Sequence, residues 1–202
     1  MKNVSIKNQG QPRATTSSMN AFLCLILAFL AAPTFAQRLN PEWKPELESA
    51  LEQFSACQNS PGSTTCNNYL GESLKKVYRI DDFYSQESGR YLVAAEIAAF
   101  LKKSDSWTVL GHSYEQKALA AAQEFANSKR AVVAVYMNDE GIGHVVVITP
   151  GHLVPSGSWG LSVPNVVSFF PSQPNKSFVD KGLSFAFGKN LMKDILIYGR
   201  NY

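Results

Sequence analysis

Residues 130–151, RAVVAVYMNDEGIGHVVVITPG, contain two short valine-rich runs separated by turn residues. Ala131–Tyr136 and His144–Thr149 have the β-branched composition that favours strands. Asn138–Gly143 lies between them and Pro150–Gly151 follows them, and both segments combine residues that favour turns. The stretch therefore predicts two strands of a sheet that follow each other closely along the chain.

The sequence on either side predicts helices before this stretch and further strands after it. Apolar residues recur at three- and four-residue steps in four earlier segments, whereas short β-rich runs return later. The predicted helices are Pro41–Cys57, one that begins at Cys66 and runs through Val77, Tyr91–Lys103, and Ser113–Ser128 with Ser113 and Gln116 in capping-box spacing; the further strands are Asn165–Phe170 and Ile195–Tyr198. This order predicts one α+β domain, with N-terminal helices packed on a C-terminal antiparallel β-sheet.

The first 36 residues have the pattern of a signal peptide. A polar, basic start is followed by the apolar run Ala21–Ala32, by Pro33, and by the small residues Thr34 and Ala36. The apolar run is shorter than the roughly 20 residues that a membrane-spanning helix needs. We therefore expect cleavage near Ala36, a mature domain of Gln37–Tyr202, and a periplasmic or secreted location.

The charge of the chain argues against a nucleic-acid partner. The chain has 19 Lys and Arg against 16 Asp and Glu, a formal net charge of +3. Three of the bases, Lys2, Lys7 and Arg13, lie in the predicted leader, which has no acidic residue, so the predicted mature domain is neutral. A neutral domain lacks the basic surplus that displaces counterions from phosphates.

Two cysteines, Cys57 and Cys66, follow the predicted leader, and they admit two interpretations. They lie nine positions apart around Pro61 and Gly62, so in an oxidising compartment they could form a disulfide. Alternatively, Cys66 begins a predicted helix, where unpaired amide groups and the positive end of the helix dipole lower the pKa of a thiol. The second interpretation makes Cys66 a nucleophile.

A nucleophilic thiolate needs an imidazole partner, and the chain has three histidines. His144 begins a β-rich run, so it would project from the rim of the sheet, where a core role does not explain it. His112 and His152 fall in predicted loops, which are ordinary places for a solvated histidine. His144 is therefore the candidate partner of Cys66.

These two segments resemble a known family. TTCNNYLGESLKKVYRIDDF, residues 64–83, resembles the nucleophile helix of the papain-like cell-wall cysteine peptidases and amidases of the NlpC and CHAP type. Residues 130–151 resemble the paired central strands of that family, in which a G-H-V strand bears the catalytic histidine. The resemblance covers about half of the chain.

The resemblance implies a papain-like fold and a set of catalytic roles. Cys66 would be the nucleophile, with its backbone N–H in the oxyanion hole, and His144 would act first as general base and then as acid. A polar residue on the next strand would orient His144. A hairpin turn near Pro150–His152 would bring Ser158 close to it, but Asn165 has the amide oxygen that fixes an imidazole tautomer, so we place Asn165 ahead of Ser158.

The substrate would be bound near this pair by aromatic and polar side chains. Trp159 lies between Ser158 and Gly160, close to the predicted rim of the sheet, where its ring could stack on a sugar or a peptide. We expect Trp159, Ser158 and Tyr69 to line the substrate groove. The alternative for Trp159 is an anchor that packs its own loop on the domain.

Together with the leader, the resemblance implies an exported, monomeric cysteine peptidase or amidase that cleaves an amide bond in peptidoglycan and needs no cofactor. No group of Cys, His and acidic residues has the spacing of a zinc site, so no metal is expected. Two alternatives remain: a noncatalytic secreted binding protein with a Cys57–Cys66 disulfide, and a wall-degrading amidase toxin.

Overall fold

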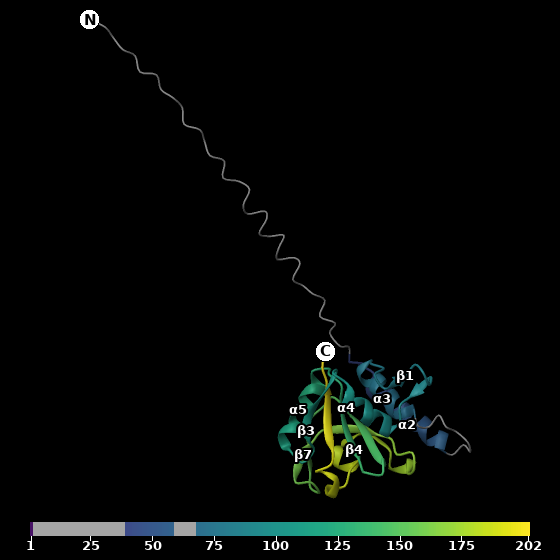
Figure 1. Ribbon diagram of the computed structural model, residues 1–202. Coiled ribbons are helices and arrows are strands. Elements are labelled where there is room, and N and C mark those ends of the chain that lie inside the picture. Colours follow the sequence, from purple (N-terminus) through teal and green to yellow (C-terminus); the bar gives the residue numbers. More distant parts are fainter. Residues whose placement is uncertain (2–38, 59–67) are drawn as a thin grey trace. The chain divides into compact units, whose positions relative to one another are not determined.

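The computed structural model describes Met1, residues 39–58 and residues 68–202, and its helices and strands lie in the unit Gln37–Tyr202 (Figure 1). The α-helices are α2 (Trp43–Gln58), α3 (Tyr69–Tyr78), α4 (Ala94–Lys103) and α5 (Gln116–Asn127). The strands are β1 (Tyr84–Ser85), β2 (Arg90–Tyr91), β3 (Trp107–His112), β4 (Val132–Met137), β5 (Gly143–Ile148), β6 (Val154–Ser156), β7 (Leu161–Val163), β8 (Asn165–Ser168), β9 (Phe178–Gly182) and β10 (Leu196–Arg200). Apart from Met1, the predicted leader lies outside the described residues, and no described helix is long and apolar enough to cross a membrane.

Six strands form one antiparallel sheet in the order β3-β10-β4-β5-β8-β9. The two valine-rich runs of the sequence are its central pair, β4 and β5, with Val133 opposite Val147 and Val135 opposite Val145. The remaining strands form two small antiparallel pairs, β1 with β2 and β6 with β7. The chain is therefore an α+β protein with an antiparallel sheet, as predicted.

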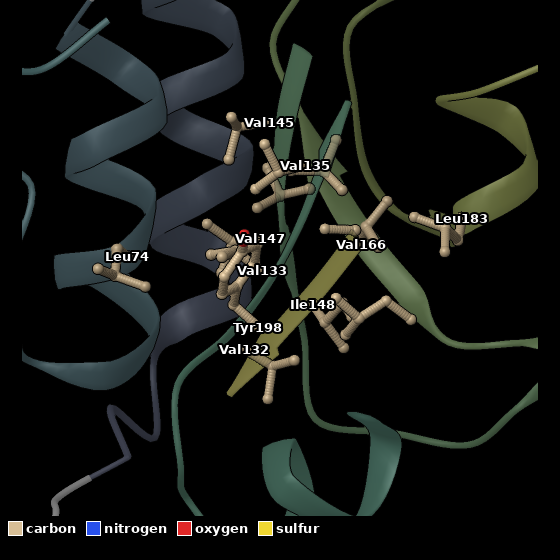
Figure 2. Close-up of a cluster of buried hydrophobic side chains, with 14 of the residues drawn as sticks. Leu74, Val132, Val133, Val135, Val145, Val147, Ile148, Val166, Leu183 and Tyr198 are labelled. Carbon is tan, nitrogen blue, oxygen red and sulfur yellow. The ribbon is translucent and has the colours of Figure 1, made fainter. Parts of the chain in front are cut away.

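Helices cover both faces of the sheet. Val133, Val145 and Val147 gather on the face that meets Leu74 of α3 (Figure 2), and Ala98 of α4 borders a pocket with Val135 on the same face. On the other face, a Cβ added to Gly199 of β10 would overlap the ring of Phe125 in α5. Because side chains alternate along a strand, β4 and β5 are buried on both sides, which explains their continuous run of valines.

The helix α2 forms because its apolar residues fall on one side. Leu47, Ala50 and Phe54 are fully or almost fully buried, at spacings of three and four residues, whereas Glu48 and Glu52 are exposed. Burial of a leucine or phenylalanine side chain contributes roughly 1.5–3 kcal/mol relative to its exposure. The predicted helix Pro41–Cys57 is therefore confirmed, with its boundaries moved by one or two residues.

The third helix begins later than the sequence predicts. Tyr91 belongs to β2, where it pairs with Tyr84, and α4 begins at Ala94. The carboxylate of Glu96 accepts a hydrogen bond from the backbone N–H of Val93, and Arg90 donates to both of its oxygens at 2.8 Å. This acidic cap satisfies an amide group at the first turn and explains why the helix begins there.

The capping box predicted at the fourth helix is wrong. The N-cap of α5 is Glu115, and the hydroxyl of the fully buried Ser113 donates instead to the carbonyl of Met192, at 3.0 Å. Gln116 bonds both the N–H and the carbonyl of Ser162 in β7. Both side chains therefore join distant parts of the chain rather than cap their own helix.

A tight connection joins β4 to β5. The side-chain oxygen of Asn138 accepts a hydrogen bond from the N–H of Ile142 at 2.7 Å, and Gly141 adopts the positive φ of 77° that favours glycine. Gly143 then begins β5, and a Cβ at this position would overlap Met137 Sδ and the carbonyl oxygen of Tyr136. This geometry delivers His144 to the sheet as the second residue of β5, opposite Tyr136.

Candidate functional site

His144 lies near the end of a central strand, with its imidazole held by one hydrogen bond and two aromatic rings. Its Nε2 lies 2.7 Å from the hydroxyl oxygen of Ser168 in β8. The ring of Phe170 stacks on the imidazole, with centroids 4.2 Å apart, and Phe187 meets its edge at 5.5 Å. Ser168 is itself fully buried. These contacts restrain the orientation of the imidazole before any ligand binds.

Burial lowers the pKa of His144 from 6.5 to about 4. The cause is desolvation of the charged form between the two phenylalanine rings, and Ser168 is a neutral partner that does not restore the charge. His144 is therefore neutral at pH 7. A neutral imidazole whose Nε2–H donates to Ser168 has a lone pair on Nδ1, and no described residue forms a hydrogen bond with Nδ1.

A pocket of about 190 Å³ lies beside His144. It is bounded by the first turns of α3 and α4, by the beginning of β5 and by the segment that follows β8. Its described lining is Leu70, Val93, Ala94, Val145, Phe169 and Pro171, together with Gly143 and His144. The recess lies on the face of the sheet that α3 and α4 cover. Because side chains alternate along β5, the imidazole of His144 projects from the opposite face to Val145, where it meets Ser168 and Phe170.

The structure places neither predicted orienting residue beside His144. The backbone carbonyl of Asn165 bonds the N–H of Thr149, five residues from His144 along the strand, which corresponds to roughly 17 Å at ~3.4 Å per residue. The side chain of Asn165 donates to Asp180 at 2.9 Å. Ser158 lies in the β6–β7 turn, where its hydroxyl contacts that of Ser156. Ser168 holds the position that the sequence analysis assigned to Asn165 or Ser158.

The topology of the sheet explains why Ser168, and not Asn165 or Ser158, lies beside His144. The segment after β5 does not return along β5, because β6 and β7 form a separate hairpin and β8 is the neighbouring strand. In this register Val147 lies opposite Val167 and Ile148 opposite Val166, so Ser168 falls near the end of the sheet that holds His144. A signal for Ser168 was present in the sequence, because it is the polar residue within the apolar run 166–170, VVSFF.

Trp159 does not line a groove. Its side chain is 4% exposed, and its Nε1–H donates to the carbonyl of Phe187 at 3.3 Å. Because the ring of Phe187 meets the edge of His144, Trp159 supports the site from behind. The loop-anchor alternative therefore describes Trp159.

Tyr69 lies next to the pocket. It is the first residue of α3, half-buried, with its ring 5.6 Å from that of Phe169 and 5.3 Å from that of Phe54. Phe169 is part of the pocket wall, so Tyr69 packs behind that wall. Nothing in the sequence distinguishes Phe169, Phe170 or Phe187 from ordinary core residues, since aromatic residues in such runs are typical of any core.

Cys66 lies outside the described residues, as does the side chain of Cys57. The helix predicted to begin at Cys66 begins, as described, at Tyr69. Of the other histidines, His152 is exposed, whereas His112 is the last residue of β3 and stacks on Tyr114. Neither has a contact with His144 among the hydrogen bonds and ring pairs of the described residues.

Comparisons with known proteins do not name this site. No family model matches the chain, and no curated protein matches it. Within the part of the chain that the structure describes, no group of three or more His, Cys, Asp or Glu residues is placed to hold a metal ion.

Proposed function

We propose that this protein is an exported, papain-like cysteine hydrolase that cleaves an amide bond in peptidoglycan, with Cys66 as nucleophile and His144 as general base and acid. One observation carries the proposal. His144 lies at the rim of a sheet, with Nε2 2.7 Å from the hydroxyl oxygen of Ser168 and Nδ1 without a hydrogen bond to any described residue. A base that is held by an orienting group and keeps one ring nitrogen available is what nucleophilic catalysis requires of the partner of a thiol.

The chain order supports Cys66 as the nucleophile. Cys66 precedes Leu70, which lines the pocket, by four residues. Covalent geometry limits the span of four residues to roughly 14 Å, so the thiol belongs to the segment that leads into the pocket wall. Among the described lining residues of this pocket, His144 is present and His112 and His152 are not.

The reaction follows from the protonation state of His144. The neutral imidazole accepts the Cys66 proton at Nδ1, and the sulfur attacks the scissile carbonyl. The imidazolium then returns that proton to the leaving amine as the carbon–nitrogen bond breaks, which leaves a thioester. Water, deprotonated by the neutral imidazole, hydrolyses the thioester and regenerates the thiol.

A digest of purified peptidoglycan tests the proposal. The protein should release new amino groups, and His144→Ala should reduce the rate by roughly 10²–10⁴-fold, the usual contribution of a general acid–base residue. Cys66→Ala should be equally inactive. His152→Ala is the matched control, because His152 is exposed and lies outside the pocket, and it should retain the full rate.

The state of the thiols separates this proposal from a noncatalytic one. Mass mapping of the active protein should find Cys66 free, and iodoacetamide should block activity at that residue. A Cys57–Cys66 disulfide in the protein as purified, together with unchanged digestion by His144→Ala, would favour a secreted binding protein.

A further inference from the structure

A second pocket, of about 90 Å³, lies on the face of the sheet that α4 covers. Its described lining is Ala98 and Lys102 of α4, Val135 and Met137 of β4, Leu196 and Tyr198 of β10, and Asp194 just before β10. Residues four apart on a helix share a side and residues two apart on a strand share a face, so the three elements direct these side chains to one place. The imidazole of His144 projects from the opposite face, so this pocket is separate from the candidate catalytic site.

Two side chains of opposite charge border this pocket without meeting each other. Lys102 and Asp194 are both exposed, and neither side chain forms an ion pair or a hydrogen bond with another described residue. A simple anion or cation in the pocket would meet one opposite charge and one like charge. A ligand that carries both an ammonium group and a carboxylate can instead engage both side chains at once.

A buried tyrosine adds a hydroxyl to the pocket. Tyr198 is 4% exposed, and its hydroxyl forms no hydrogen bond with another described residue. The oxygen is not among the fully buried polar atoms that lack a partner, so the small exposed part of this side chain includes the hydroxyl. Because Tyr198 lines the pocket, the hydroxyl opens there. Burial raises the pKa of Tyr198, so at neutral pH the hydroxyl keeps its proton and can donate it to a ligand.

The rest of the pocket is apolar and limits the size of a ligand. Ala98 and Val135 are each 6% exposed, and Met137 and Leu196 are half-buried. The volume of about 90 Å³ corresponds to roughly three water molecules at ~30 Å³ each, and it is well below the ~300–1,000 Å³ of sites that enclose a drug-sized ligand. The pocket therefore suits a charged head group with a very short side chain.

We propose that this pocket binds a small free amino acid such as alanine through its zwitterionic head group. The carboxylate of Asp194 accepts hydrogen bonds from the ammonium group of the ligand, and Lys102 and the hydroxyl of Tyr198 donate to its carboxylate. The methyl group packs on Met137 and Leu196. This site goes beyond the proposed hydrolase function and does not depend on it, because its described lining shares no residue with the candidate catalytic site.

NMR titration of the full chain with L-alanine and with D-alanine tests the site. At least one enantiomer should shift the methyl signals of Met137 and Leu196. N-acetylalanine lacks the ammonium group and alaninamide lacks the carboxylate, so each should bind at least about tenfold more weakly than the better enantiomer. If both enantiomers leave these signals unchanged, or if either blocked form binds as well as alanine, the proposal is wrong.

Variants test whether the alanine lies in this pocket. Tyr198→Phe removes a hydroxyl that bonds no described residue, so the fold should be unaffected and the Kd for alanine should rise roughly tenfold. Lys102→Ala and Asp194→Asn should each raise the Kd by a similar factor. Lys103→Ala is the matched control and should bind as the wild type does, because Lys103 is exposed beside Lys102 on α4 and is not among the described lining residues. Unchanged binding in Tyr198→Phe and in Lys102→Ala would place the alanine elsewhere and overturn the proposal.

Discussion

Ser168 is a fully buried hydroxyl whose described side-chain hydrogen bond goes to Nε2 of His144. Ser168→Ala removes this bond while the ring remains stacked on Phe170. We expect kcat to fall by roughly ten- to a hundredfold, the size of loss seen when residues that orient a metal-ligating histidine are removed. KM should change little because Ser168 does not line the pocket.

Ser168→Thr, which keeps the hydroxyl, should recover most of kcat. Initial rates across the pH range check both expectations, and an equal loss in Ser158→Ala would contradict them, because Ser158 contacts Ser156 instead.

The β4–β5 hairpin delivers His144 through Gly143, which tolerates no Cβ. In Gly143→Ala the added carbon would overlap the carbonyl oxygen of Tyr136, so the strand must shift. We expect a loss of about 1–3 kcal/mol in the free energy of unfolding, typical of overpacking, together with reduced activity. Gly141→Ala strains a positive φ of 77° at a cost of about 1–2 kcal/mol, but a Cβ there meets nothing within 4 Å. Urea unfolding and turnover of both variants should therefore show similar destabilisation, with activity lost only at Gly143.

The elements that can be predicted from local sequence are those whose burial pattern is visible in their own amino-acid composition. The strands β4 and β5 are buried on both faces, so their valine runs identify them. The edge strands β3 and β9 were not predicted. The sequence of β9, FVDKG, contains two charged residues, which do not favour a strand. The strand β3 pairs with β10, which lies far away along the chain. The place of His144 at the beginning of a strand was predictable, because the valine run that follows it identifies β5. Ser168 stands out in the sequence as a polar residue in an apolar run, but its place beside His144 was not predictable, because the register of β8 depends on the β6–β7 hairpin inserted between β5 and β8.

The burial of His144 also affects the stability of the whole domain, with a sign that can be worked out. The pKa of His144 is 6.5 in the unfolded chain and about 4 in the folded one, so between these pH values the unfolded chain binds more protons. The free energy of unfolding therefore falls as pH drops from 6.5 to 4, and His144 contributes up to about 3 kcal/mol to this fall. Above pH 7 the titration of His144 makes no difference to the free energy of unfolding. We expect His144→Gln, which cannot titrate, to lose less stability than the wild type over this interval. Urea unfolding of both proteins at several pH values measures the difference between their free energies of unfolding. The two proteins have the same carboxylates, so the effect of titrating the carboxylates cancels in this difference. His152→Gln, changed at an exposed histidine, should follow the wild-type curve. Parallel curves for His144→Gln and the wild type would show that His144 takes up a proton in the folded protein as readily as in the unfolded chain, and therefore that the packing of Phe170 and Phe187 does not hold the imidazole neutral.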